Sequence, residues 1–167
     1  MKLLTLLSAV IGVQIMIISG CGGGGGSEGS VNGGSTTKTA TLVFSSYSTN
    51  AQIAGFDFTV TLPKNVTITT DSSGALSSSV VYLSGQFATA PALNAAGVNY
   101  DTTSSTSNKL QIVYAGLSGY PVGEFLTVVC NVPVSYTLNI NDISFIASFK
   151  STIGNPIPGA YAKATFN

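Results

Sequence analysis

The chain has no arginine, no histidine and no tryptophan, and charged residues make up only 7% of its 167 positions. Six lysines balance six acidic residues, so the formal net charge is zero. A neutral chain without a basic patch lacks the electrostatic footprint of a nucleic-acid-binding protein. The absence of histidine removes the side chain that enzymes use most often for proton transfer. The composition therefore argues against nucleic acid as a partner and against an enzyme.

Cysteine is also scarce: the two cysteines are Cys21 and Cys130. Cys21 follows a positive residue, Lys2, then an apolar run over residues 3–18 and two small residues. This order is typical of a signal peptide. The apolar run is marginal for a spanning helix, which needs about 20 apolar residues. An uncleaved membrane anchor and a plain secreted protein remain the less favoured alternatives.

The segment Ile18-Ser-Gly-Cys21 resembles the lipobox of bacterial lipoproteins. The resemblance implies that residues 1–20 are a lipoprotein signal peptide, that cleavage occurs before Cys21, and that Cys21 carries the lipid. Each buried CH₂ of an acyl chain contributes about 0.8 kcal/mol, so several chains would anchor the protein stably to a membrane. The expected location is the bacterial cell envelope. Gly22 replaces the Asp that implies inner-membrane retention, which favours the outer membrane, on its periplasmic or cell-surface side.

Residues 21–38 are rich in Gly and Ser and predict a flexible tether with a root-mean-square span of roughly 20–25 Å. A Gly-rich phosphate-binding loop would need a strand before it and a helix after it, and the pattern predicts neither. Residues 39–167 remain as one folded domain. The tether should hold this domain near the membrane and leave it free to reorient.

Alternation of apolar and polar residues predicts an all-β domain. In the stretch that begins at Ile53, one side of the extended chain carries Phe56, Phe58, Val60 and Leu62. We expect strands over residues 39–47, 53–68, 79–83, 97–100, 109–115, 124–132, 136–140, 143–149 and 160–166. We expect turns at Gly116–Gly123 and at Asn141-Asp142, where the apolar parity changes. About eight to nine short strands predict an antiparallel β-sandwich. A membrane barrel is disfavoured because it needs more and longer strands with aromatic girdles.

Three segments in this order resemble a cohesin domain: Gly55–Pro63, Lys109–Ala115 followed by Gly123–Val129, and Ile140–Phe145. The resemblance covers about residues 39–167 and implies a jelly-roll sandwich that docks a protein partner of the dockerin type. The chain departs from the family where Leu62-Pro-Lys64 replaces the usual Tyr-Asp-Pro. No contact residue is carried over from the family.

The acidic residues offer two kinds of site, and neither is favoured. Asp57 and Glu124 would be the pair for glycoside hydrolysis, but exposed strand acids are the simpler interpretation, so we predict no catalytic residue. Asp71, Asp101 and Asp142 sit among Ser, Thr and Asn oxygens that suit Ca²⁺. They lack the spacing of a dedicated calcium loop, so turn formation is the preferred role and no cofactor is expected.

Three functions remain open after these exclusions. The first is a non-enzymatic protein-interaction module, for which the structural sign is a flat sheet face with exposed Leu, Val or Tyr. The second is a carbohydrate-binding module, which needs coplanar exposed tyrosines; the candidates are Tyr47, Tyr82, Tyr100, Tyr120 and Tyr161. The third is a structural or adhesin subunit that pairs through an uncharged edge strand. Cys130, on the apolar side of its strand, is expected to be an inert core thiol.

Overall fold

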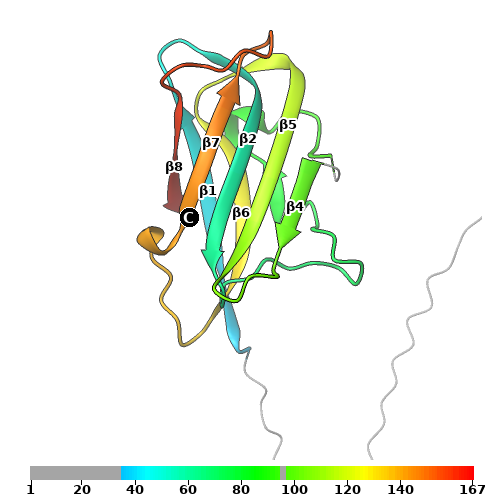
Figure 1. Cartoon of the computed structure of the whole chain (residues 1–167), viewed down its shortest axis with the longest axis vertical. Helices are drawn as coiled ribbons and strands as arrows, with labels where there is room; N and C mark the ends of the chain where they lie inside the picture. Colours follow the sequence, from blue (N-terminus) through cyan, green and yellow to red (C-terminus); the bar gives the residue numbers. More distant parts are fainter. Residues whose placement is uncertain (1–34, 95–96) are drawn as a thin grey trace, which may run out of the picture. The chain divides into compact units, whose positions relative to one another are not determined.

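The computed structural model describes residues 35–94 and 97–167, which form an antiparallel β-sandwich of eight strands (Figure 1). The strands are β1 (Thr37–Tyr47), β2 (Gln52–Pro63), β3 (Val81–Leu83), β4 (Val98–Asp101), β5 (Ser107–Pro121), β6 (Glu124–Pro133), β7 (Ser144–Lys150) and β8 (Tyr161–Phe166). Two 3₁₀ turns are η1 (Gly85–Phe87) and η3 (Ile140–Asp142). The predicted signal peptide, Cys21 and most of the predicted tether lie outside the described residues.

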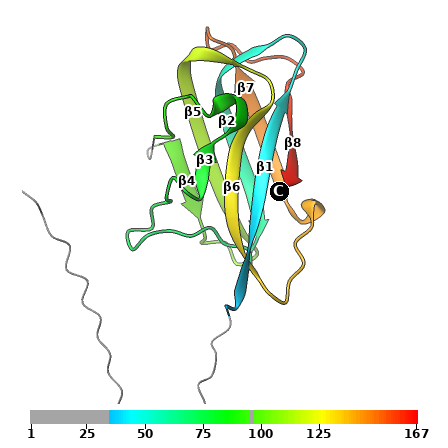
Figure 2. The ribbon, with the colours of Figure 1, turned by 180° about the vertical axis from the view of Figure 1, so that it is seen from behind.

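The strands form two four-stranded sheets, in the orders β3-β6-β1-β8 and β4-β5-β2-β7. Opposite views show the two layers, with β2 central in one and β1 central in the other (Figures 1 and 2). β1 pairs with β8, β2 with β7, β3 with β6 and β4 with β5, all antiparallel. This nested pairing is that of a jelly roll. The predicted antiparallel sandwich is confirmed.

The core lies between the sheets and follows the alternation in the sequence. The four apolar residues of β2 are all buried: Phe56, Phe58, Val60 and Leu62. The rings of Phe58 and Phe44 from the opposite sheet meet edge to face at 4.7 Å. Such pairs add about 0.5–1.5 kcal/mol beyond the burial of their area. Every buried side chain of the described residues belongs to residues 42–149, so the segment 35–167 contains its own core.

A bulge in β6 adds one more ring to this core. Phe44 lies opposite Leu126, whereas the next residue, Ser45, lies opposite Glu124. Phe125 is therefore an extra residue in the ladder, and neighbouring Phe125 and Leu126 are both buried. The bulge thus lets β6 contribute two consecutive residues to the core.

Two expected boundaries change at the ends of β2 and β1. The predicted continuation of the second strand past Pro63 is wrong, because β2 ends at Pro63 and Val66 N–H donates to its carbonyl oxygen at 2.9 Å in a turn. Proline cannot donate to a ladder, which ends the regular pairing. Val66 is nevertheless fully buried in the core. β1 begins at Thr37, so the last two residues of the segment predicted as tether, Thr37 and Lys38, belong to this strand.

Two further expectations are wrong in the second half. The predicted turn at Gly116–Gly123 is mostly strand, because β5 continues to Pro121 and resumes pairing with β2 at Tyr120 after a bulge. The predicted strand over residues 136–140 is a loop that ends in η3. Asp142 closes this loop, accepting hydrogen bonds from Asn139 N–H at 2.9 Å and from Tyr136 Oη at 3.1 Å. The predicted turn at Asn141-Asp142 is confirmed.

Three chain connections gather at one end of the sandwich. They join β1 to β2, β5 to β6 and β7 to β8. Together with the last part of β5 they are called the loop end below (residues 48–51, 116–123 and 151–160). Ser46 N–H donates to Gly123 O at 2.7 Å, which links the end of β1 to the connection between β5 and β6. Because β1 runs from Thr37 toward this end, the chain enters the domain at the opposite end (Figure 1).

Candidate functional site

The outer side of the β4-β5-β2-β7 sheet is a regular four-stranded surface. Along each strand, the residues that alternate with the core point outward. The strand register places Thr59 between Gln111 of β5 and Ile146 of β7, and Asp57 between Val113 and Ser148. We call this surface the outer β2 face (residues 57, 59, 61, 109, 111, 113, 144, 146, 148 and 150).

Two aliphatic side chains stand exposed on the outer β2 face. Val113 is 56% exposed and Ile146 is 76% exposed, although both belong to regular strands. They lie on opposite sides of the central strand β2. Contiguous exposed apolar surface marks docking sites, whereas single exposed aliphatic groups are common, so these two side chains make the face a candidate only through their shared position on one sheet.

The charges of this face are matched in pairs. Lys150 Nζ lies 2.9 Å from Asp57 Oδ2, and both side chains are nearly half exposed. Such an exposed pair contributes only about 0–1 kcal/mol to stability. Lys109 lies opposite Asp101 in the register of β5 and β4. The pKa of Asp101 is lowered, mainly by hydrogen bonds from Thr103 and secondarily by Lys109. The face therefore combines a small net charge with exposed aliphatic groups.

The structure does not join Asp57 and Glu124 into one site. Asp57 lies on the outer β2 face in contact with Lys150, whereas Glu124 begins β6 in the other sheet. A pair of carboxylates for glycoside hydrolysis must flank one bond. Nothing in this placement provides such a pair.

Asp71, Asp101 and Asp142 all form turns, as preferred from the sequence. Asp71 accepts hydrogen bonds from the N–H groups of Ser73 and Ala75, and Asp142 caps η3. The hydrogen bonds, of which the Ser73 hydroxyl is the strongest, lower the pKa of Asp71. Within residues 35–94 and 97–167, no three Asp, Glu, Cys or His side chains form a group that could hold a metal ion.

The tyrosines do not form a coplanar strip. Tyr47 and Tyr161 stack on each other at 5.3 Å, so each ring covers one face of the other. Lys163 Nζ lies 5.1 Å from the centre of the Tyr47 ring. Tyr82 lies on β3 at the far edge of the same sheet, and Tyr100 accepts a hydrogen bond from Ile68 N–H at 3.0 Å. The aromatic pair is thus a local cluster and not a platform for an extended sugar chain.

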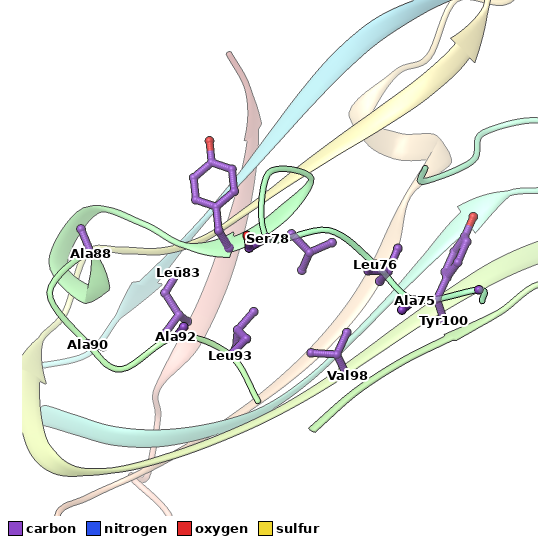
Figure 3. Close-up of a pocket in the computed structure, with 13 residues that line it drawn as sticks. Ala75, Leu76, Ser78, Leu83, Ala88, Ala90, Ala92, Leu93, Val98 and Tyr100 are labelled. Atoms are coloured by element: carbon purple, nitrogen blue, oxygen red, sulfur yellow. The ribbon is translucent and has the colours of Figure 1, made fainter. Parts of the chain in front are cut away.

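An apolar groove opens between the edge strands β3 and β4. Its volume is about 360 Å³, and the segment 74–93 forms one wall (Figure 3). Figure 3 shows Leu76, Leu83, Leu93 and Val98 around the hollow, with Tyr100 at one end. The lining carries no charged side chain. This groove was not predicted from the sequence, because its walls come from segments that only the fold brings together.

Two groups in the core have strongly raised pKa values. Burial raises the pKa of the Cys130 thiol to about 12, and Cys130 is fully buried. Burial, with nearby Tyr120, raises the pKa of the Tyr114 hydroxyl to about 12. The thiolate is the reactive form of cysteine. The prediction of an inert core thiol agrees with this environment.

Comparisons with protein-family models, with curated proteins and with solved structures find no match to this chain. Within the part of the chain that the structure describes, no helix has the length and apolar character needed to cross a bilayer.

Proposed function

We propose that the protein is a non-enzymatic, lipid-anchored protein of the bacterial cell envelope whose sandwich domain docks a protein partner. The observation that carries this proposal is the outer β2 face, where Val113 and Ile146 are exposed on both sides of β2. A few residues near the centre of an interface, shielded from water, carry most of its binding energy, and Val113 and Ile146 are the large apolar side chains that this face offers for that role. The resemblance to cohesin domains suggests a dockerin-type partner.

The remaining parts of the proposal rest on the sequence. The lipobox-like segment ending at Cys21 supplies the membrane attachment, and Gly22 favours the outer membrane. The paired charges of the outer β2 face support a neutral partner surface, because an unmatched charge buried on docking would be costly.

The partner can be sought by affinity capture from the host's membrane and secreted fractions, with residues 35–167 as bait. We expect one stoichiometric protein that stays bound when soluble polysaccharide is added. The variants Val113→Lys and Ile146→Lys should lose this protein, because each places a charge at the buried centre of the interface. Thr165→Lys adds the same charge to the exposed end of β8 in the other sheet and should retain it.

Carbohydrate binding is the second candidate, favoured by the exposed pair Tyr47 and Tyr161. Ser48, Thr49 and Gly159 border a hollow beside these rings, where hydroxyl groups and aromatic faces meet. Retention of the bait on insoluble cellulose or chitin, with no protein captured, would replace the first proposal by this one. A third candidate, an adhesin subunit pairing through an edge strand, is countered by Lys163 on β8 and Lys150 on β7, since lysine on an edge opposes pairing.

A further inference from the structure

The two most exposed large apolar side chains of the described residues lie at the loop end. Leu117 is fully exposed, and Ile153 is 79% exposed. Leu117 belongs to the bulge in β5, and Ile153 to the connection between β7 and β8. The two segments adjoin, because a Cβ atom at Gly119 would lie only 3.0 Å from Thr152 Cγ2. Leu117 and Ile153 are therefore aliphatic groups on neighbouring segments, the end of β5 and the β7–β8 connection.

The loop end carries no charge. Residues 48–51, 116–123 and 151–160 contain no Asp, Glu, Lys or Arg. The nearest carboxylate in the chain is Glu124, which is half-buried and packs beside Gly85. Charged side chains are expensive inside a bilayer, so a segment that enters one must be free of them.

Two tyrosines and one lysine lie on β1 and β8, where these strands meet the loop end. Tyr47 and Tyr161 are 40% and 49% exposed at the base of the loop end. Lys163 lies two residues farther along β8, with its ammonium group over both rings. Tyrosine rings concentrate at the headgroup level of membranes, and lysine reaches the lipid phosphates. The polar side chains around Leu117 and Ile153 are small and uncharged, such as Ser118 and Thr152, and can remain among the lipid headgroups.

We propose that the loop end inserts into the surface of a lipid bilayer, with Leu117 and Ile153 entering the acyl region and Tyr47, Tyr161 and Lys163 at the headgroups. This contact is made by the domain itself and is separate from the lipid on Cys21. It turns the loop end toward a membrane and leaves the outer β2 face at the side. The inference does not depend on the proposed docking of a protein partner.

The test uses residues 35–167, which contain the whole core and lack Cys21, so no acyl chain contributes. Because Cys130 is buried with a raised pKa, a maleimide-linked nitrobenzoxadiazole dye will react only at a new cysteine, Ser118→Cys. On vesicles of equimolar phosphatidylcholine and phosphatidylglycerol we expect a blue shift of the dye emission and quenching by acyl-brominated lipids. The same dye at Ser148→Cys, on the outer β2 face, should show neither change.

A second measurement compares vesicle affinity, titrated to high lipid concentration. The double variant Leu117→Ser with Ile153→Ser should bind roughly tenfold more weakly or worse, because two apolar groups no longer leave water. Ile146→Ser removes an equally exposed aliphatic group from the outer β2 face and should bind unchanged. An unquenched dye at position 118, or an equal loss in Ile146→Ser, overturns the proposal. If the unsubstituted domain does not bind vesicles and the double variant loses the captured protein partner, the loop end docks a protein and the membrane proposal is overturned.

Discussion

Phe125, the extra residue at the bulge in β6, contributes to the core although it interrupts the alternation of its strand. The bulge in β6 turns its ring inward, where the centroids of Phe56 and Phe149 lie 5.0 and 5.3 Å away. Both contacts are edge to face and join residues of different strands and both sheets. A residue that an unbroken alternation would point to solvent therefore holds the two layers together.

Phe125→Ala should lower the free energy of unfolding by about 3–5 kcal/mol, because the surrounding rings cannot fill the cavity. Urea unfolding followed by circular dichroism measures this loss. Phe166→Ala, at the 41% exposed end of β8, should cost about 1 kcal/mol or less. Equal losses in both variants would show that Phe125 does not carry the predicted packing.

The buried thiol and phenol predict a fall in stability at alkaline pH. The pKa of Cys130 rises from 9.0 to about 12 on folding, and that of Tyr114 from 10.0 to about 12. The unfolded chain therefore releases these protons first, and the stability present below pH 9 is lost as the pH rises toward 12. Urea midpoints across this range should fall, and Cys130→Val should make the fall shallower. A midpoint that stays level to the highest pH would contradict both pKa directions.

At the scale of elements, β2 and β5 form the centre of their sheet, and Gly55 lets them approach closely. A Cβ atom on Gly55 would lie 2.8 Å from the carbonyl oxygen of Tyr114. That oxygen belongs to the backbone of β5 and cannot move aside as a side chain would. The position requires glycine for space and not for its φ angle.

Gly55→Ala should therefore destabilise the domain by about 1–3 kcal/mol, the usual cost of forcing atoms into a packed interior. The matched control is Gly154→Asn. Gly154 has a φ of +80° and nothing within 4 Å of a new Cβ atom, and asparagine tolerates that conformation. The control should change the free energy of unfolding by about 0.5 kcal/mol or less. Thermal unfolding of both variants distinguishes a steric effect from a general intolerance of glycine substitution.

The sequence predicted elements well where alternation was strong and poorly where pairing depended on distant partners. The alternation of Phe56 to Leu62 predicted both the strand and its buried side. Residues 136–140 alternate as well, yet they find no partner strand and form a loop. Conversely, residues 116–121 have turn composition, yet the last two of them, Tyr120 and Pro121, pair with Ile53 and Gln52 after a bulge. Alternation indicates which side of a strand is apolar, but it does not indicate which neighbouring strand will supply the hydrogen bonds.

The same limit applied to the candidate site. The parity of β5 and β7 places Val113 and Ile146 outward, which could be predicted from the sequence. That they flank β2 follows only from the sheet order β4-β5-β2-β7. The exposure of Leu117 and Ile153 on adjoining loops likewise required the fold. Turn formation by the three aspartates was predictable because it depends on neighbours within a few residues.

At the scale of the whole molecule, the first and last strands are paired, so the fold is complete only when the C-terminus is present. β8 pairs with β1 from Leu42–Phe166 to Tyr47–Tyr161, beside the buried Phe44. Deleting residues 160–167 exposes the edge of a central strand, and we expect an unfolded or aggregated chain in size-exclusion chromatography. Removing residues 1–34 should leave the urea midpoint of the domain unchanged. A folded, monomeric chain after the C-terminal deletion would contradict this role of β8.

The chain enters the domain through β1, and the direction of this strand determines how the fold responds to a pulling force. β1 lies between β6 and β8, antiparallel to both. A pull from Ser35 against position 118 at the far end loads the β1 hydrogen bonds together, in shear. A pull between Ser35 and Asn167 instead peels β8 from β1 one pair at a time. Single-molecule force spectroscopy should therefore find a higher rupture force in the first geometry, which is the load that the domain would bear if the proposed anchor and the proposed membrane contact act at its opposite ends.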